Sequence, residues 1–271
     1  MLRFLTGGES HGPAVTAIVD GLPAGLPLEP ATINADLRRR QAGYGRGGRM
    51  RIEHDEAEIL GGVLRGETTG APLVLQIANR DWPNWQGREW PAVTVPRPGH
   101  GDYAGAIKYG LDDARPILER ASARETAGRV AAGAAARALL RAFEIEVGSY
   151  VERIGSAAAE LPADAPAALW ARAEESDVRC PDAAAAEAMR RAIDAAGAAG
   201  DSLGGVFVVA AVGLPVGLGS HVQWDRRLDA LIAAAVMSIP GVKGVEIGPA
   251  FENAGRPGTA VHDELLPGDG G

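Results

Sequence analysis

Short runs of alternating apolar and polar residues fill much of the first eighty positions, the pattern of half-buried β-strands. Glycine pairs and Thr/Gly turns separate the runs. Because one face of each strand is apolar and the other polar, we expect antiparallel pairing. The pattern predicts strands at 2–6, at 15–20 and repeatedly within 50–79.

A helical period interrupts these strands at residues 30–40. Pro30 stands in the first turn, and Ile33 and Leu37 share one face. A second helix is expected from Ser122 to about Phe143, because Ser122 and Glu125 have the spacing of a capping box. Further patterns predict strands at 145–154 and 203–212, a turn and short strand at 214–219, and helices at 162–175, 182–197 and 225–238. Strand, turn and long helix thus occur twice, which suggests two related halves.

Composition places the chain among ordinary soluble proteins. It has 271 residues, of which 46% are hydrophobic and 5% aromatic. No signal peptide and no membrane-length apolar run is recognised. The single cysteine, Cys180, has no partner for a disulfide or a metal. We therefore expect a cytoplasmic protein without a metal site.

One short stretch, residues 38–51, departs sharply from the acidic character of the chain. It carries six arginines, four glycines and no acidic residue, whereas the whole chain has a formal net charge of −8. Guanidinium groups gathered in this way can bind a multiply charged anion, and glycines let backbone N–H groups approach it. A solvated basic loop and a nucleic-acid contact are the alternatives, although the basic footprint is small for nucleic acid.

Two histidines lie in glycine-rich loops. His11 belongs to the sequence GGESHG, and His100 to PRPGHGDYAGAIKYG. Such loops leave an imidazole open to a ligand, and histidine can transfer protons near neutral pH. His11 could instead be a solvent-exposed loop residue, whereas the Pro/Gly loop of His100 indicates a site.

Two more segments have open interpretations. The N-terminus of the helix expected at Ser122 offers backbone N–H groups beside Arg120 and Arg124, which suits an anion but also an ordinary capped helix. Residues 81–90 contain three tryptophans, which could serve partner contacts or local packing equally well.

Five motifs in order resemble those of the chorismate synthase family. They read GESHG, RRRQAGYGRGGRM, RPGHGDYAGAIKYG, RASARETAGRVAAG and VKGVEIG. The resemblance covers the whole chain. It implies a lyase of the shikimate pathway, which supplies aromatic amino acid biosynthesis. The enzyme eliminates phosphate from 5-enolpyruvylshikimate 3-phosphate in an overall anti-1,4 sense to give chorismate.

The same resemblance implies a cofactor, a fold and an assembly. Reduced FMN is required without net redox change, so NADPH would be only an indirect source of reducing equivalents, and a separate flavin reductase could be a partner. The expected fold is α+β, a β-α-β sandwich of antiparallel sheets around central helices with internal pseudo-symmetry. The expected assembly is a cytoplasmic homotetramer that binds neither nucleic acid nor membrane.

Site residues carry over from the matching motifs. His11 and His100 are the expected catalytic residues, the first protonating the reduced flavin and the second facing the departing phosphate. The expected substrate ligands are Arg39, Arg40, Arg46, Arg49 and Arg124. The expected cofactor-binding residues are Arg40, Arg46, Arg120, Ala121, Ser122, Pro240 and Gly241.

The chain departs from the family at two places. The family more often has Asn or Gln followed by Ala where this chain has Pro240-Gly241. The family also continues for roughly a further hundred residues, the size of a small domain, with flavin and catalytic motifs that are missing here. We therefore expect residues 1–271 to form a single chorismate synthase-like domain that lacks its C-terminal portion. A non-catalytic anion- or RNA-binding protein and an inactive fragment of the enzyme are the alternatives.

Overall fold

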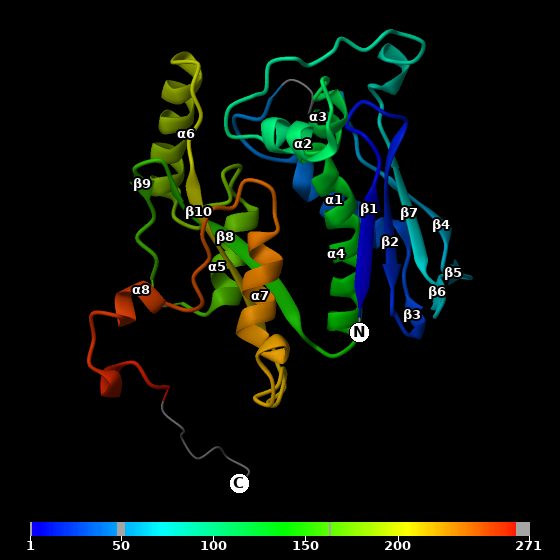
Figure 1. Cartoon of the computed structure of the whole chain (residues 1–271). Coiled ribbons are helices and arrows are strands. Elements are labelled where there is room, and N and C mark those ends of the chain that lie inside the picture. Colours follow the sequence, from blue (N-terminus) through cyan, green and yellow to red (C-terminus); the bar gives the residue numbers. More distant parts are fainter. Residues whose placement is uncertain (1, 48–51, 163, 264–271) are drawn as a thin grey trace. The chain divides into compact units, whose positions relative to one another are not determined.

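The computed structural model of the chain describes residues 2–47, 52–162 and 164–263 (Figure 1). Two compact units make up the chain, Met1–Leu214 and Pro215–Gly271. Antiparallel sheets and helices together confirm the predicted α+β class. None of the helices in the described ranges is long and apolar enough to cross a bilayer.

A four-stranded antiparallel sheet forms the N-terminal part of the first unit. Its strands lie in the order β1 (Arg3–Gly7), β2 (Ala14–Asp20), β7 (Leu73–Ala78) and β4 (Ala57–Gly61). Alternate residues point to the core, so Ala17 and Val19 of β2 and Leu75 and Ile77 of β7 are fully buried. A small antiparallel sheet accompanies it, in the order β3 (Ala24–Pro27), β6 (Glu67–Thr69) and β5 (Val63–Leu64). The strands predicted within 2–79 are thereby confirmed.

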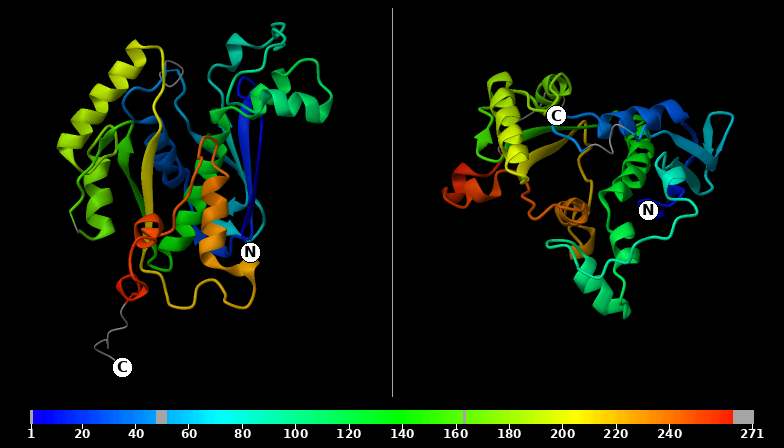
Figure 2. Two further views of the ribbon diagram at one scale, coloured as in Figure 1. Left: turned by 60° about the vertical axis from the view of Figure 1, so that its left-hand side comes forward. Right: turned by 90° about the horizontal axis from the view of Figure 1, so that it is seen from above.

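Helices α1 (Pro30–Gln41) and α4 (Thr126–Arg141) pack against each other, and α4 also lies along the buried face of the sheet (Figures 1 and 2). The predicted apolar face of α1 is buried, with Ile33 and Leu37 fully enclosed. Small residues let α4 approach the strands closely. A Cβ added at Gly128 would lie 3.1 Å from the Thr6 side chain, so a larger residue there would push the helix away.

A second antiparallel sheet belongs to the later half of the first unit. It has the order β10 (Gly205–Val212), β8 (Glu146–Ile154) and β9 (Ala157–Ala158), and it contacts α5 (Pro166–Glu174) and α6 (Ala183–Ala198). The indole of Trp170 packs on the bare backbone of Gly148, where an added Cβ would meet a ring carbon at 2.1 Å. Met189 of α6 is fully buried in this part of the core. These elements match the helices and strands predicted for 145–212.

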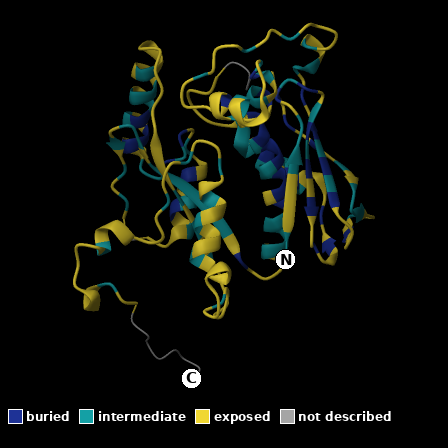
Figure 3. Ribbon diagram, in the orientation of Figure 1, coloured by how far each residue is buried: buried dark blue, intermediate teal, exposed yellow. Residues whose placement is uncertain are grey.

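The second unit is described for residues 215–263. It contains η4 (Trp224–Arg226), α7 (Leu228–Met237), α8 (Ala250–Asn253) and η5 (Gly258–Ala260). The predicted helix at 225–238 is present, but its apolar residues Leu231 and Ile232 remain 50% and 45% exposed. Most of α7 is accordingly coloured as exposed in Figure 3. The short strand predicted at 214–219 is wrong. Gly217 and Gly219 adopt φ of +99° and +75°, so the segment turns and does not extend.

Candidate active site

The last turn of α1 carries Arg40 into a polar cluster in the first unit. Arg40 Nε donates to Thr126 Oγ1 at 3.0 Å, Nη1 to Asp55 Oδ2 at 3.0 Å, and Nη2 to the Ala123 carbonyl at 3.1 Å. The guanidinium therefore joins α1 to the start of α4 and to the segment before β4.

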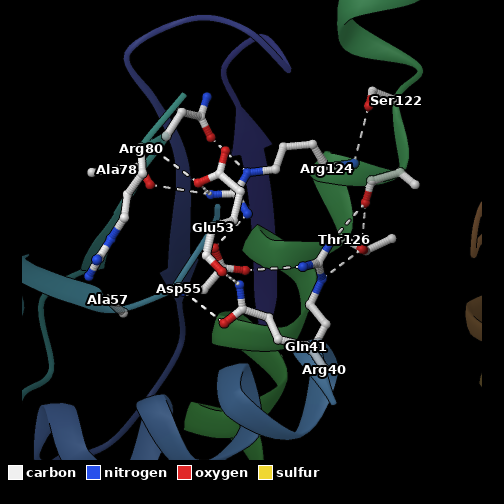
Figure 4. A network of polar contacts seen from close by, with 12 residues as sticks. Arg40, Gln41, Glu53, Asp55, Ala57, Ala78, Arg80, Ser122, Arg124 and Thr126 are labelled. Carbon is white, nitrogen blue, oxygen red and sulfur yellow. Dashed lines mark hydrogen bonds and ion pairs between the residues drawn. The ribbon is translucent and has the colours of Figure 1, made fainter. Parts of the chain in front are cut away.

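Asp55 lies between two arginines from different parts of the chain (Figure 4). Its Oδ1 accepts a hydrogen bond from Arg124 Nη1 at 2.5 Å, while Arg124 Nε donates to Asn79 Oδ1 at 2.7 Å and Nη2 to the Ala78 carbonyl at 3.3 Å. The Arg124 side chain is only 5% exposed. Its donors are thus largely occupied by protein acceptors, and it holds the cluster together from within.

Residues 53–55 are fixed by the side chain of Gln41, directly after Arg40. Gln41 Nε2 donates to the Glu53 carbonyl at 2.7 Å, and its Oε1 accepts from the Asp55 N–H at 2.9 Å. Glu53 is buried, and its carboxylate accepts from the Arg80 N–H at 2.9 Å and lies 3.7 Å from Arg124 Nη2. These contacts hold the two carboxylates of the cluster in place.

Arg46 adds a third guanidinium to this cluster. Burial lowers the pKa of Arg40, and the positive charges of Arg124 and Arg46 lower it further, whereas Asp55 raises it. Burial also lowers the pKa of Arg46. Among the described residues, Arg46 makes no hydrogen bond or ion pair, and its Nε lies 2.8 Å from the place of a Cβ at Gly43. The cluster therefore carries a positive charge that the described carboxylates do not directly neutralise.

The loop that carries Arg46 is anchored to the later half of the unit. The Tyr44 hydroxyl hydrogen-bonds the Asp194 carboxylate of α6 at 2.8 Å, and the Tyr44 N–H donates to the Asp177 carbonyl at 2.9 Å. Gly45 has φ of +70° and touches Ile193, with a virtual Cβ at 2.4 Å from the Ile193 side chain. Gly45 therefore allows close packing against Ile193 of α6, and α6 positions the arginine loop.

His11 is held in its loop by the short helix α3 (Arg115–Arg120). The Glu119 carboxylate accepts from the His11 N–H at 2.8 Å, and its two oxygens lie 2.9 and 3.0 Å from His11 Nδ1. Ser10 beside it donates from its N–H to the Glu119 carbonyl, and its hydroxyl lies 3.0 Å from that of Ser122. Asn79 donates to the Gly12 carbonyl at 2.7 Å. Asn79 thereby links the histidine loop to Arg124.

His100 lies in an exposed turn just before α2 (Asp102–Tyr109). Arg97 binds the buried Asp102 in a two-pronged pair at 2.8 and 3.0 Å, and this hydrogen bonding lowers the pKa of Asp102 to about 2. The position of a Cβ at Gly101 is 3.9 Å from the side chains of both Ile117 and Ala121. Both histidine-bearing loops therefore pack against the segment of α3.

The helix expected from Ser122 begins differently. Ser122 caps a 3-10 turn, η3 (Ala123–Glu125), by accepting from the Arg124 N–H, and α4 starts only at Thr126. Glu125 does not complete a capping box. Its carboxylate instead accepts from the Thr6 hydroxyl at 2.7 Å and from Arg129 at 3.0 Å, because a buried acid gains more from charged and hydroxyl donors. Arg120 Nη2 reaches the same Thr6 at 2.7 Å.

Arg39, Arg49, Pro240 and Gly241 are the expected site residues that remain. Arg39 points to the later half of the unit, where Nε binds Glu174 at 2.8 Å and Nη2 binds the Ser149 hydroxyl at 2.9 Å. Arg49 lies outside the described residues. Pro240 and Gly241 belong to the second unit, in a turn where Gly241 has φ of +91°.

Sequence reasoning missed the acids and the amide that organise the cluster. Asp55, Asn79 and Glu119 are all buried, and each binds a predicted site residue. The available signal was a polar residue directly beside a predicted strand or beside an arginine motif. No group of three or more histidine, cysteine or acidic side chains able to hold a metal occurs in the described ranges.

Comparison with known proteins decides the family. The family model described as chorismate synthase matches residues 2–269. This chain belongs to the chorismate synthase family. The predicted enzyme class, a carbon–oxygen lyase of the shikimate pathway and aromatic amino acid biosynthesis, is confirmed with it, and the RNA-binding alternative is not favoured.

Named relatives support the same family. The chorismate synthase of Pelobacter propionicus is 57% identical over 275 residues, a match that covers 98% of this chain and 70% of that protein. The enzyme of Geobacter sulfurreducens is 56% identical over 274 residues, with 98% and 70% covered. A crystal structure of a chorismate synthase superposes with a TM-score of 0.85 at 47% identity, covering 99% of this chain and 75% of that one. The chain thus spans about 70% of the length of these curated relatives.

Proposed function

We propose that this chorismate synthase binds 5-enolpyruvylshikimate 3-phosphate at the arginine cluster and eliminates its phosphate to give chorismate. The observation that carries the proposal is the Arg46 guanidinium, which lies close enough to Arg40 to lower the pKa of Arg40 and has no acidic partner among the described residues. A phosphate or carboxylate placed between the two would relieve their repulsion and accept charge-assisted hydrogen bonds.

The arginines divide the work. Arg46 and the remaining Nη N–H groups of Arg40 contact the substrate. Arg124 is 5% exposed and bound to Asp55 and Asn79, so it holds the cluster in place without contacting the substrate. Guanidinium groups held in fixed positions stabilise the negative charge that develops on a leaving phosphate. Arg39 would join the substrate only by leaving Glu174, so we assign it a secondary role.

The two histidines provide the proton transfers. His11 has 20% of its side chain exposed and is held by Glu119, which suits a group that keeps one orientation while it exchanges a proton. His100 lies in the exposed turn whose base is fixed by the Arg97–Asp102 pair. We assign His11 to the cofactor side and His100 to the departing phosphate.

Reduced FMN is the cofactor of the proposed reaction, and the donors of the first unit fit its anionic groups in part. Arg120 is 45% exposed and lies beside Ser122 and the His11 loop. The chemistry that reduced FMN supplies when bound is electron density for the departure of phosphate and a base for the ring proton. NADPH would enter only through a reductase that regenerates the reduced flavin.

The test uses this chain with the substrate under anaerobic, reducing conditions. We expect FMN binding that tightens when 5-enolpyruvylshikimate 3-phosphate is present, and the appearance of chorismate absorbance. An Arg46→Ala variant should lose the substrate effect on FMN binding. If FMN fails to bind with or without substrate while the chain is retained on RNA in a salt-dependent manner, the proposal is wrong.

A further inference from the structure

We infer that Glu119 is a positioning residue for His11, which fixes the tautomer and the orientation of the imidazole so that Nε2 is the nitrogen that exchanges protons. The inference rests on the catalytic role proposed for His11 and adds the group that prepares it. Glu119 belongs to α3, more than one hundred residues away in the sequence.

The Glu119 carboxylate is buried beside His11. Its side chain is 1% exposed, accepts from the His11 N–H at 2.8 Å and from Arg115 Nη1 at 3.3 Å, and lies 2.9 Å from His11 Nδ1. Arg115 is four residues earlier in the same helix and compensates the buried negative charge. The same carboxylate thus contacts both an arginine and the imidazole.

An ionised carboxylate can only accept hydrogen bonds, so Nδ1 must carry a proton for the contact to be favourable. Both carboxylate oxygens lie within 3.0 Å of Nδ1. Neutral His11 is then the Nδ1–H tautomer, and its lone pair resides on Nε2. Glu119 also accepts a hydrogen bond from the backbone N–H of His11. This second contact holds the loop, so that the imidazole stays beside the carboxylate.

The tryptophan-rich segment supplies a second restraint. Trp85 lies against the His11 ring with 4.3 Å between ring centroids and 44° between planes, and its Nε1 donates to Asp81 at 2.9 Å. Trp90 packs edge-on against Trp85 at 5.7 Å. The imidazole is thus contacted by a carboxylate at Nδ1 and by a tilted indole against its ring.

The deciding measurement is the tautomer of His11 in the full chain labelled with ¹⁵N-histidine. A His11→Gln variant assigns the His11 signals among the five histidines. We expect the ¹⁵N shifts of neutral His11 to report Nδ1–H in the unsubstituted protein. In Glu119→Gln the amide can either accept from or donate to Nδ1, so the Nε2–H form should appear. A wild-type Nε2–H tautomer, or a Glu119→Gln spectrum identical to wild type, overturns the inference.

Kinetics and a matched control complete the test. Asp36→Asn removes another carboxylate that pairs with an arginine, Arg137, and should leave the His11 tautomer unchanged. Where chorismate formation is measurable, Glu119→Gln should lower kcat about tenfold to hundredfold and change KM by less than about twofold, because substrate contacts remain. If Glu119→Gln changes the His11 tautomer but the unsubstituted chain forms no chorismate, the proposed function is rejected and the positioning role of Glu119 is retained.

Discussion

The Asp55 carboxylate and the Arg124 guanidinium form a buried ion pair, with 2.5 Å between Oδ1 and Nη1. The other oxygen of Asp55 binds Arg40, so one acid connects α1 to the turn before α4. Two guanidinium groups would repel each other in this position without the acid between them. Asp55 and Arg124 therefore fix the position of Arg40, and with it the place beside Arg46 where an anion could bind.

Asp55→Asn should destabilise the protein by about 3–5 kcal/mol, because Arg40 loses its acidic partner and the buried Arg124 keeps only the more distant Glu53, at 3.7 Å. Urea unfolding followed by circular dichroism measures the change. Glu56→Gln is the matched control, since its carboxylate is 72% exposed and 3.9 Å from Arg80, and it should cost less than about 1 kcal/mol. Equal effects for the two variants would contradict the structural role of Asp55.

Arg46→Ala should weaken substrate binding about tenfold to hundredfold while leaving the free energy of unfolding nearly unchanged. A hydrogen bond to a charged group contributes about 1.5–3 kcal/mol to binding. Folding stability should change little, because the substitution removes no hydrogen bond or ion pair of Arg46 with a described residue. Steady-state KM and thermal unfolding check the two parts. Arg172→Ala, which removes an arginine paired with Asp164 near the surface, should leave KM unchanged. An unchanged KM in Arg46→Ala would remove Arg46 from the substrate site.

Asp102 should make the loop of His100 sensitive to acid. The Arg97 hydrogen bond lowers the pKa of Asp102 from 3.8 to about 2, so the folded state holds this proton more weakly than the unfolded chain. Its contribution to stability is complete above pH 3.8 and is lost as the pH falls through about 2. The difference in unfolding free energy between wild type and Asp102→Asn should therefore shrink in that window. In an Arg97→Gln background this pH dependence should disappear, and its persistence would assign it to another group.

Gly148→Ala should destabilise the protein by about 1–3 kcal/mol, because the new methyl group would overlap the Trp170 ring. Gly133→Ala, in the exposed middle of α4, meets no atom within 4 Å and should stabilise by about 0.5–1 kcal/mol. Thermal unfolding of both variants separates close packing from backbone entropy. A neutral Gly148→Ala would show that α5 can move away from β8.

The strands and helices could be predicted because their periods are local. Ile33 and Leu37 alone define the buried face of α1, and the strand β10 follows from an unbroken apolar run. The start of the helix near Ser122 was harder to predict, because Ser122 can cap either a 3-10 turn or an α-helix. A capping box would need the Glu125 carboxylate, which instead accepts from Thr6. That choice depends on Thr6, which is distant in sequence.

The site could be predicted only in part for a related reason. Arg39 and Arg40 are adjacent and look alike in sequence, yet one step along a helix turns a side chain by about 100°. Arg39 therefore binds Glu174 while Arg40 binds Asp55. Glu119 meets His11 across 108 positions, a pairing that no local pattern reveals. The three tryptophans had two open interpretations, and local packing accounts for Trp85 and Trp90.

The anchoring of Tyr44 to Asp194 across 150 positions has a consequence for biosynthesis. A ribosome releases the arginine loop long before it has made the helix that fixes it. The nascent chain must therefore carry this basic loop without its final support, open to polyanions in the cell, until α6 emerges. The arginine loop can therefore be fixed only after α6 has been synthesised, although Arg40, Asp55 and Arg124 all precede that helix in the chain.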